Sequence, residues 1–321
     1  MADYFIRIGW FWKFASPFFE ILDDRLETNI GGISLSNPVG LAAGYDKNCS
    51  LLKSFLHMGF GYVVGGTVLY SANSGNPKPR LLRLNSNSAL LNSLGFPSKG
   101  SDYARNMISG YIPLNKPVII SIAGLTIDEF TKCHNLIEPF VSGIELNISS
   151  PNTKGLKVFQ QPEIFKKLLN KVNQKRRKPI FVKLPPIFDN KTMEVTLDLI
   201  NVCTESGVDG ITAINTKPTN DERLKIGSGG LSGRPIFPHM IETVRLCRQV
   251  AGRNLSINAC GGIFSAEDAW KAFEAGANSI QVLTGLIYEG PSIAKKINKG
   301  LIEIIEKKGI PSLMAYISNR P

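Results

Sequence analysis

The sequence predicts an α/β fold in which eight parallel strands alternate with helices and close into a (β/α)8 barrel. From about residue 38 one pattern repeats: a short apolar run, a polar or glycine-rich stretch, and an amphipathic segment. Most runs are β-branched and nearly continuous, which is typical of parallel strands buried on both faces. This pattern favours a TIM barrel, with a doubly wound open sheet as the alternative. The predicted strands are Pro38–Ala42, Tyr62–Val64, Val118–Ile122, Ile144–Leu146, Ile180–Leu184, Ile211–Ala213, Leu255–Ala259 and Ser279–Leu283.

Helix start signals lie between these strands. Thr126 with Glu129, and Ser265 with Asp268, have capping-box spacing, and Pro162 suits the first turn of a helix. One interval, residues 65–117, is too long for a simple unit and contains turn-rich segments at 75–80 and 95–97. We therefore expect an insertion after the second strand that lies over the barrel mouth and includes a small antiparallel element.

The first 30 residues differ from the rest because they are unusually aromatic. Tyr4, Ile8, Phe11 and Trp12 share one helical face. Such a helix either caps the open end of the barrel or lies in a membrane interface, and its aromatic excess beside a basic protein favours the membrane. The expected organisation is a helical appendage over residues 1–30 and a barrel over residues 31–321.

Composition indicates a globular protein, since 43% of the 321 residues are hydrophobic and 20% are charged. No apolar run is long enough to span a bilayer, and the N-terminus lacks a secretory pattern. We expect a cytoplasmic protein, with peripheral contact at the cytoplasmic face of the membrane through residues 1–30 as a further possibility. The five cysteines are scattered without a CxxC pair, so no metal site is expected.

The formal net charge of +11 fits nucleic acid, anionic lipid, an anionic substrate and cofactor, or a solvated surface. The densest cluster, residues 175–178, closes a predicted helix, where cations suit the negative end of the helix dipole and need no partner. The chain has no extra domain or clustered aromatic and basic face, so nucleic acid is not expected as a partner.

Polar residues recur at the carboxyl ends of the predicted strands, where the functional groups of such barrels gather. The turns at 259–262 and 283–285 suit phosphate, because glycines let backbone N–H groups approach an anion. The segment 227–233 is not a dinucleotide loop, since its last glycine is displaced and no strand leads into it. The rim residues are Lys47, Thr67, Asn147 to Asn152, Lys183, Asn215, Thr216, Gly261, Gly262, Thr284 and Gly285.

Four segments resemble motifs of the dihydroorotate dehydrogenase family, in the family's order. They are GLAAGYDK at residues 40–47, GNPKPR at 75–80, NISSPNT at 147–153 and GGLSGRP at 229–235. The resemblance runs from about residue 30 to residue 308. It implies a barrel enzyme that oxidises dihydroorotate to orotate in pyrimidine biosynthesis, with FMN as the cofactor.

The resemblance points to two classes of electron acceptor. Ser150 before Pro151 resembles the serine-base, quinone-linked class (class 2), because the cytosolic classes usually place cysteine there. The segment NSLGFP at residues 92–97 and Ser121 instead resemble the cytosolic enzymes. Quinone is the expected acceptor, with the aromatic N-terminus as its apolar entry, while fumarate and NAD through a partner subunit remain open.

The resemblance also implies roles for individual residues. The catalytic residues are Ser150, as the base, and Lys47. The implied FMN contacts are Ala43, Gly44, Lys47, Thr67, Ser121, Asn147, Lys183, Ile214, Gly233, Gly261, Gly262, Leu283, Thr284 and Gly285. The implied substrate contacts are Lys47, Asn92, Ser93, Leu94, Gly95, Phe96, Asn147, Asn152, Asn215 and Thr216.

The chemistry of these residue types fits the roles. Asparagine offers both donors and an acceptor to a flat ring rich in amide groups, and Lys47 can pair with its carboxylate. Lys183 can stabilise negative charge on the reduced flavin, unless it pairs with a neighbouring carboxylate. Ser150 is a poor base at its free pKa, so we expect a relay through an ordered water and a threonine. No histidine lies in these motifs, so a hydrolase triad is not indicated.

Two other functions compete with this hypothesis. The first keeps the flavin barrel but changes the substrate to another dihydropyrimidine, or to dihydrouridine in RNA. The second is a non-catalytic barrel that binds a phosphate ligand or docks on a membrane. In the favoured hypothesis, the loop over residues 151–160 closes over the substrate ring and excludes water.

Overall fold

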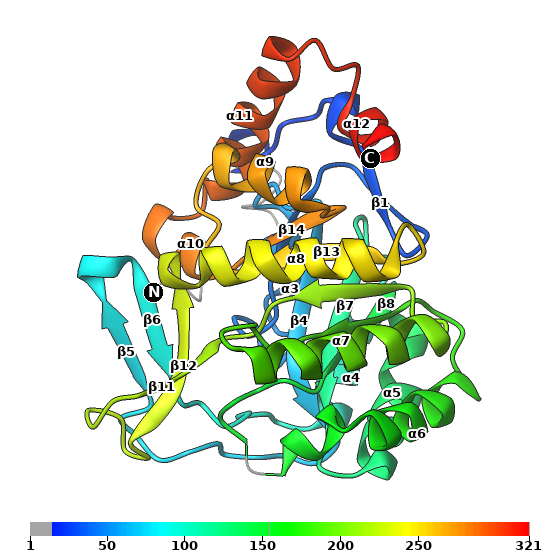
Figure 1. The fold of residues 1–321 in the computed structure, drawn as a ribbon, viewed down its shortest axis with the longest axis vertical. Coiled ribbons are helices and arrows are strands. Elements are labelled where there is room, and N and C mark those ends of the chain that lie inside the picture. The colour runs from blue at the N-terminus through cyan, green and yellow to red at the C-terminus, as the bar shows by residue number, and fades with distance from the viewer. Residues whose placement is uncertain (1–14, 154, 321) are drawn as a thin grey trace.

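Eight parallel strands form a closed barrel in the computed structural model, which describes residues 15–153 and 155–320 (Figure 1). Their order around the barrel is β10-β13-β14-β3-β4-β7-β8-β9, so the open sheet is excluded and the predicted barrel is confirmed. Each predicted run overlaps one of these strands, although the bounds differ at several ends. Their bounds are β3 Val39–Leu41, β4 Tyr62–Leu69, β7 Val118–Ala123, β8 Gly143–Asn147, β9 Ile180–Lys183, β10 Gly210–Ala213, β13 Ser256–Cys260 and β14 Ser279–Val282.

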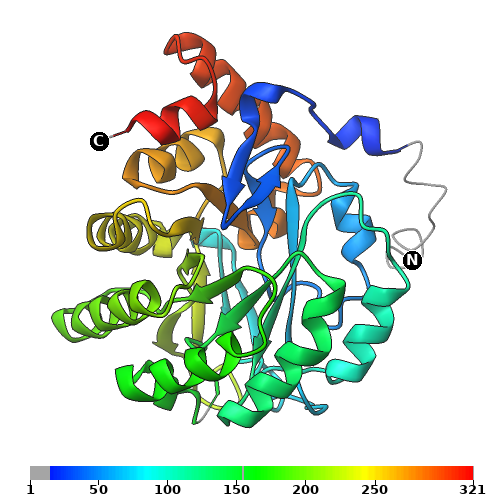
Figure 2. The same cartoon turned by 90° about the vertical axis from the view of Figure 1, so that its right-hand side faces the viewer.

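Helices surround the strands on the outside of the barrel (Figure 2). The predicted capping signals are confirmed: Thr126 Oγ1 accepts from the Glu129 N–H, and Ser265 with Asp268 forms a capping box. Pro162 begins its helix. The helices are α3 Leu52–Leu56, α4 Ser101–Ser109, α5 Ile127–Ile137, α6 Pro162–Asn173, α7 Asn190–Glu205, α8 Phe237–Ala251, α9 Ala266–Ala275, α10 Thr284–Glu289, α11 Ile293–Lys307 and α12 Leu313–Asn319.

A short hairpin closes the amino-terminal end of the barrel. Its strands are β1 (Thr28–Ile30) and β2 (Ile33–Leu35), which pair antiparallel. Ile30 and Leu35 pack in one cluster with Tyr62, Val64, Ile119 and Phe181 of the barrel interior. Because this end is filled with apolar side chains, the opposite end, where the strands terminate, is the one available for a site.

The insertion after β4 contains the predicted antiparallel element. Strands β5 (Leu81–Leu84) and β6 (Ala89–Asn92) form a hairpin. The insertion starts later than predicted, because β4 continues to Leu69 through its pairing with β7.

A second pair of strands, which the sequence did not reveal, extends this hairpin. β11 (Lys217–Asn220) and β12 (Ser228–Gly233) join it in a four-stranded sheet of order β11-β12-β6-β5, seen beside the barrel in Figure 1. The glycine-rich segment is therefore a strand. A Cβ on Gly230 would stand 2.0 Å from Thr216 Oγ1, so close packing requires glycine there.

The predicted aromatic face at Tyr4, Ile8, Phe11 and Trp12 lies outside the described residues. Residues 15–19 are helical, and the side chains of Phe18 and Leu22 are 74% and 83% exposed. Within residues 15–153 and 155–320, no helix is long and apolar enough to cross a membrane.

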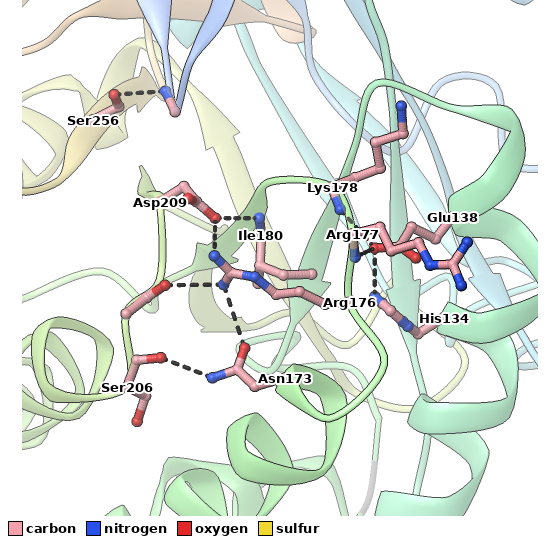
Figure 3. Close-up of polar contacts among 12 residues, drawn as sticks. His134, Glu138, Asn173, Arg176, Arg177, Lys178, Ile180, Ser206, Asp209 and Ser256 are labelled. Atoms are coloured by element: carbon pink, nitrogen blue, oxygen red, sulfur yellow. Dashed lines mark hydrogen bonds and ion pairs between the residues drawn. The ribbon is translucent and has the colours of Figure 1, made fainter.

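Buried polar contacts anchor the basic segment that follows α6 (Figure 3). Glu138 accepts hydrogen bonds from the backbone N–H groups of Arg177 and Lys178, and the Arg176 guanidinium pairs with Asp209 at 3.0 Å. This part of the cluster therefore has structural partners within the chain.

Replacing Glu138 by alanine is expected to lower the free energy of unfolding by about 2 kcal/mol, because two partly buried N–H donors lose a charged acceptor. Urea denaturation measures the change, with Glu163→Ala as the control. Glu163 is exposed on α6, so its removal should change stability by no more than about 0.5 kcal/mol. Equal midpoints for the two variants would contradict the anchoring role.

Candidate active site

A cavity of about 350 Å³ opens at the carboxyl ends of the barrel strands, beside the four-stranded sheet. Its volume is typical of a site for a small molecule or cofactor. The predicted residues that line it are Ala43, Gly44, Lys47, Thr67, Asn92, Leu94, Gly95, Phe96, Asn147, Ser150, Asn152, Lys183, Ile214, Asn215, Thr216, Gly233, Gly261, Gly262, Leu283, Thr284 and Gly285.

Two predicted site residues do not line the cavity. Ser93 is fully buried next to Asn92, and its backbone N–H donates to the Arg80 carbonyl. Ser121 is buried behind Thr67, with 3.1 Å between their Oγ atoms. In this geometry Ser121 positions Thr67 and does not itself reach the cavity.

The structure adds lining residues that the sequence had not indicated. Cys260 and Gln281 lie near the ends of their barrel strands, where the two-residue period of strands could have revealed them. Leu81, Leu90 and Ser232 come from the four-stranded sheet. Their position depends on how that sheet packs over the barrel, and no local pattern indicates this.

Asparagine amides on one side of the cavity are held by a continuous hydrogen-bond network. Asn147 Nδ2 donates to Thr67 Oγ1 at 3.0 Å, and Asn147 Oδ1 accepts from Asn215 Nδ2 at 3.1 Å. Asn215 Nδ2 also donates to Ser149 Oγ, which in turn donates to the Lys183 carbonyl. These contacts fix the orientation of the amides before any ligand binds.

A second asparagine pair joins the insertion to the loop after β8. Asn152 Nδ2 donates to the Asn92 carbonyl at 3.0 Å and to Asn92 Oδ1 at 3.1 Å. Asn92 Nδ2 donates to the Gly230 carbonyl of β12. Asn92 therefore connects three segments at the cavity wall.

The cavity is cationic, because its lining includes two lysines and no acidic side chain. Burial, together with the nearby positive charges of Arg80 and Lys183, lowers the pKa of Lys47 to about 8. Burial also opposes the charge on Lys183, but Cys260 and Glu145 outweigh it and raise the pKa of Lys183. Such a site favours an anionic ligand.

The direct partner of Lys183 is not a carboxylate. Its Nζ donates to Cys260 Sγ at 3.7 Å, and no acidic group of the described chain lies within 4.0 Å of it. The remaining ammonium donors are available to the cavity.

The turns after β13 and β14 provide donors suited to phosphate. Gly261 and Gly262 have φ angles of +140° and +73°, and within the described residues neither of their N–H groups has a protein acceptor. A Cβ on Gly262 would lie 2.6 Å from Phe237 Cβ, so this turn requires glycine. Thr284 Oγ1 donates to Ser232 Oγ at 2.9 Å at the start of α10. Unpaired N–H groups such as those of Gly261 and Gly262 are the donors that a phosphate needs.

Ser149 and Ser150 follow β8 but have different surroundings. Ser149 Oγ is engaged with Lys183 and Asn215. Ser150 lines the cavity, is 8% exposed, and its Oγ has no hydrogen-bond partner within the described residues. Of the two hydroxyls, that of Ser150 is therefore free to act on a ligand.

A comparison with models of protein families identifies the family of the chain. The model of the family described as dihydroorotate dehydrogenase matches residues 25–305. The chain belongs to the dihydroorotate dehydrogenase family. The resemblance of the four motifs is thereby confirmed, and the chain is an oxidoreductase and not a non-catalytic barrel.

Curated relatives extend over most of this dehydrogenase. The chain is 35% identical over 305 residues to a protein of Chloroflexus aurantiacus that is named dihydroorotate dehydrogenase (quinone). This alignment covers 88% of this chain and 83% of the relative. The chain is 36% identical over 301 residues to a protein of the same name from Christiangramia forsetii, covering 89% and 87%.

A solved structure has the same architecture. The dihydroorotate dehydrogenase of Eimeria tenella, determined in complex with ferulenol, matches with a TM-score of 0.85 and 29% identity. The match covers 97% of this chain and 94% of that chain. The fold of this chain is thus that of a solved dihydroorotate dehydrogenase.

Proposed function

We propose that this chain oxidises dihydroorotate to orotate at the described cavity, with Ser150 as the base, FMN as the cofactor and a quinone as the electron acceptor. The observation that carries the proposal is the unpartnered Ser150 hydroxyl in a cationic cavity lined by oriented asparagine amides. Family membership favours dihydroorotate over dihydrouridine in RNA as the substrate.

The cavity residues suit FMN in charge and in donor type. The free N–H groups of Gly261 and Gly262 would hold the phosphate. The hydroxyls of Thr284 and Ser232, which now donate to Ser232 Oγ and to the Leu90 carbonyl, would turn toward it. Lys183 would lie against the flavin ring and complement negative charge there. The bound cofactor supplies the acceptor for the hydride that leaves C6 of the substrate.

The remaining groups would bind the substrate and remove its proton. Lys47 would pair with the carboxylate, and the amides of Asn92, Asn147, Asn152 and Asn215 would match the donors and acceptors of the ring. Ser150 Oγ would accept the proton from C5. Thr153, three residues later, has a buried Oγ1 without a partner in the described chain, which fits the expected relay through an ordered water.

The acceptor is tested by reduction and reoxidation. Purified protein should be yellow, and anaerobic dihydroorotate should bleach the flavin absorbance completely. A short-chain ubiquinone should then restore the absorbance at least 100-fold faster than fumarate or NAD, a difference of about 2.7 kcal/mol in activation free energy. Faster reoxidation by fumarate would reassign the acceptor, and colourless protein would overturn the flavin assignment.

The N-terminal segment is proposed to serve quinone entry and peripheral contact with the membrane. Phe18 and Leu22 are exposed apolar side chains at the end of this segment, which supports the proposal. Removing residues 2–14 should slow ubiquinone reduction about 10-fold or more, because an apolar ligand would lose buried contact area. Flavin reduction by dihydroorotate should be unchanged. Equal quinone turnover in the full-length and the truncated protein would contradict the entry role. If the two proteins sediment with liposomes to the same extent, membrane contact through this segment would be contradicted.

A further inference from the structure

The barrel interior beneath the cavity is polar. Glu145 on β8, Thr212 on β10, Asn258 on β13 and Ser279 on β14 are all essentially inaccessible to solvent. Barrels of this kind usually fill these layers with branched apolar side chains. A carboxylate at this depth loses its hydration and is tolerated only where hydrogen bonds or an opposite charge compensate.

The Glu145 carboxylate has only one hydrogen-bond partner within the described residues. Thr212 Oγ1 donates to its Oε2 at 2.8 Å, while its Oε1 has no partner. Glu145 therefore lacks the full set of donors that would stabilise a buried carboxylate by hydrogen bonds alone, so a nearby positive charge would stabilise its ionised form.

The strand register places Lys183 next to Glu145 and Thr212. Lys183 lies opposite Asn147 of β8 and opposite Thr212 of β10. Glu145 precedes Asn147 by two residues, so its side chain is on the same face of β8. The Glu145 carboxylate attracts the Lys183 ammonium and helps to raise the pKa of Lys183 against the effect of burial.

The other titratable groups around Lys183 cannot replace this carboxylate. Cys260 contacts Lys183 directly, but burial raises the pKa of its thiol, which keeps it neutral near pH 7. Lys47 repels Lys183. Tyr62, which interacts electrostatically with Glu145 and Cys260, has its pKa raised by burial and is also neutral. Within the described chain, Glu145 is the carboxyl group that interacts electrostatically with Lys183.

We propose that Glu145 is a positioning residue whose carboxylate, held by Thr212, is the buried counter-charge that keeps the Lys183 side chain protonated at the cavity wall. The barrel core thereby sets the charge that the cavity presents to the flavin ring. The consequence for the flavin rests on the proposed function, but the charge on Lys183 does not, so the first test uses the protein without FMN.

The decisive variant is Glu145→Gln, which has nearly the same shape and still offers an oxygen to Thr212. The titration of Lys183 is followed by NMR of lysine side chains in the apoprotein, with Lys183→Met used to assign the signal. We expect the midpoint of Lys183 to fall by more than one pH unit in Glu145→Gln. An unchanged midpoint would overturn the proposal, whatever the activity of the holoenzyme.

Two control variants separate charge from hydrogen bonding and from distant effects. Thr212→Val removes the hydroxyl but leaves the carboxylate, so the Lys183 midpoint should stay within half a pH unit of the wild-type value. Glu138→Gln removes a buried carboxylate outside the barrel and should leave the titration midpoint of Lys183 unchanged. A shift in Thr212→Val as large as that in Glu145→Gln would overturn the role of the charge.

The flavin-loaded enzyme provides a second readout besides activity. The reduction potential of the flavin is measured as a function of pH. In Glu145→Gln this curve should gain an inflection at the pH where Lys183 now titrates, and the wild-type enzyme should have no inflection at that pH. If Glu145→Gln does not fold, the double variant with Lys183→Met should recover folded protein, because both buried charges are then absent. A double variant that stays unfolded while Lys183→Met folds would overturn the pairing.

Discussion

Replacing Ser150 by alanine is expected to slow the reduction of the flavin by dihydroorotate by about 100-fold to 10,000-fold, the usual contribution of a positioned proton acceptor. The Ser150 hydroxyl lines the cavity and has no partner in the described chain, so its removal takes away the proton acceptor without disturbing a hydrogen bond. Anaerobic stopped-flow spectroscopy measures the rate directly, because the flavin absorbance disappears as the substrate is oxidised.

The specificity of this result depends on three comparisons. The FMN content of Ser150→Ala should equal that of the wild-type protein. Ser150→Cys should retain part of the rate, because a thiol also accepts the proton. Ser149→Ala should mainly weaken substrate binding, since Ser149 holds Asn215 and does not itself act on the ring. A wild-type rate in Ser150→Ala would show that another group removes the proton.

Replacing Lys47 by methionine is expected to weaken the binding of orotate about 10-fold to 100-fold near neutral pH, because a charge-assisted hydrogen bond contributes about 1.5–3 kcal/mol. Methionine preserves much of the side-chain volume, so the cavity wall is retained. Orotate titration followed by the flavin spectrum measures the dissociation constant. Unchanged affinity in Lys47→Met would assign the carboxylate to a different cation.

The same lysine should make binding depend on pH. Burial together with Arg80 and Lys183 lowers the pKa of Lys47 to about 8 in the free protein. The protonated form pairs with the carboxylate, so affinity should be constant below this pH and fall about tenfold for each pH unit above it. An anionic ligand raises the pKa of Lys47 in the complex. The Lys47→Met variant should lack the inflection near pH 8. If the inflection persists in this variant, it belongs to another titrating group.

The sequence alone predicted the barrel and most of its rim. Eight β-branched runs at regular intervals indicate parallel strands, because a strand buried on both faces needs apolar side chains at nearly every position. The polar residue that follows each run falls at the carboxyl end of a strand, and closure of the barrel brings these ends together. Lys47, Asn147, Ser150 and Lys183 could be predicted for this reason.

Local pattern was insufficient where glycine or long-range packing decides the structure. Strand β12 is rich in glycine, which has low strand propensity, and it exists because β6 and Thr216 pack closely against it. Ser121 and Ser93 belong to matching motifs, yet burial behind Thr67 and next to Asn92 keeps their side chains from the cavity. Motif position predicts the neighbourhood of a residue but not the direction of its side chain.

The sequence by itself thus determined the strands, the rim residues and the family, because these depend on periodicity and on short motifs. Only the tertiary structure decided which side chains reach the cavity and that Leu81, Leu90 and Ser232 from a separate sheet form part of its wall. It also decided that Glu145 interacts electrostatically with Lys183 inside the barrel. These features depend on distances between segments far apart in the chain, and such distances are set by the packing of the whole barrel.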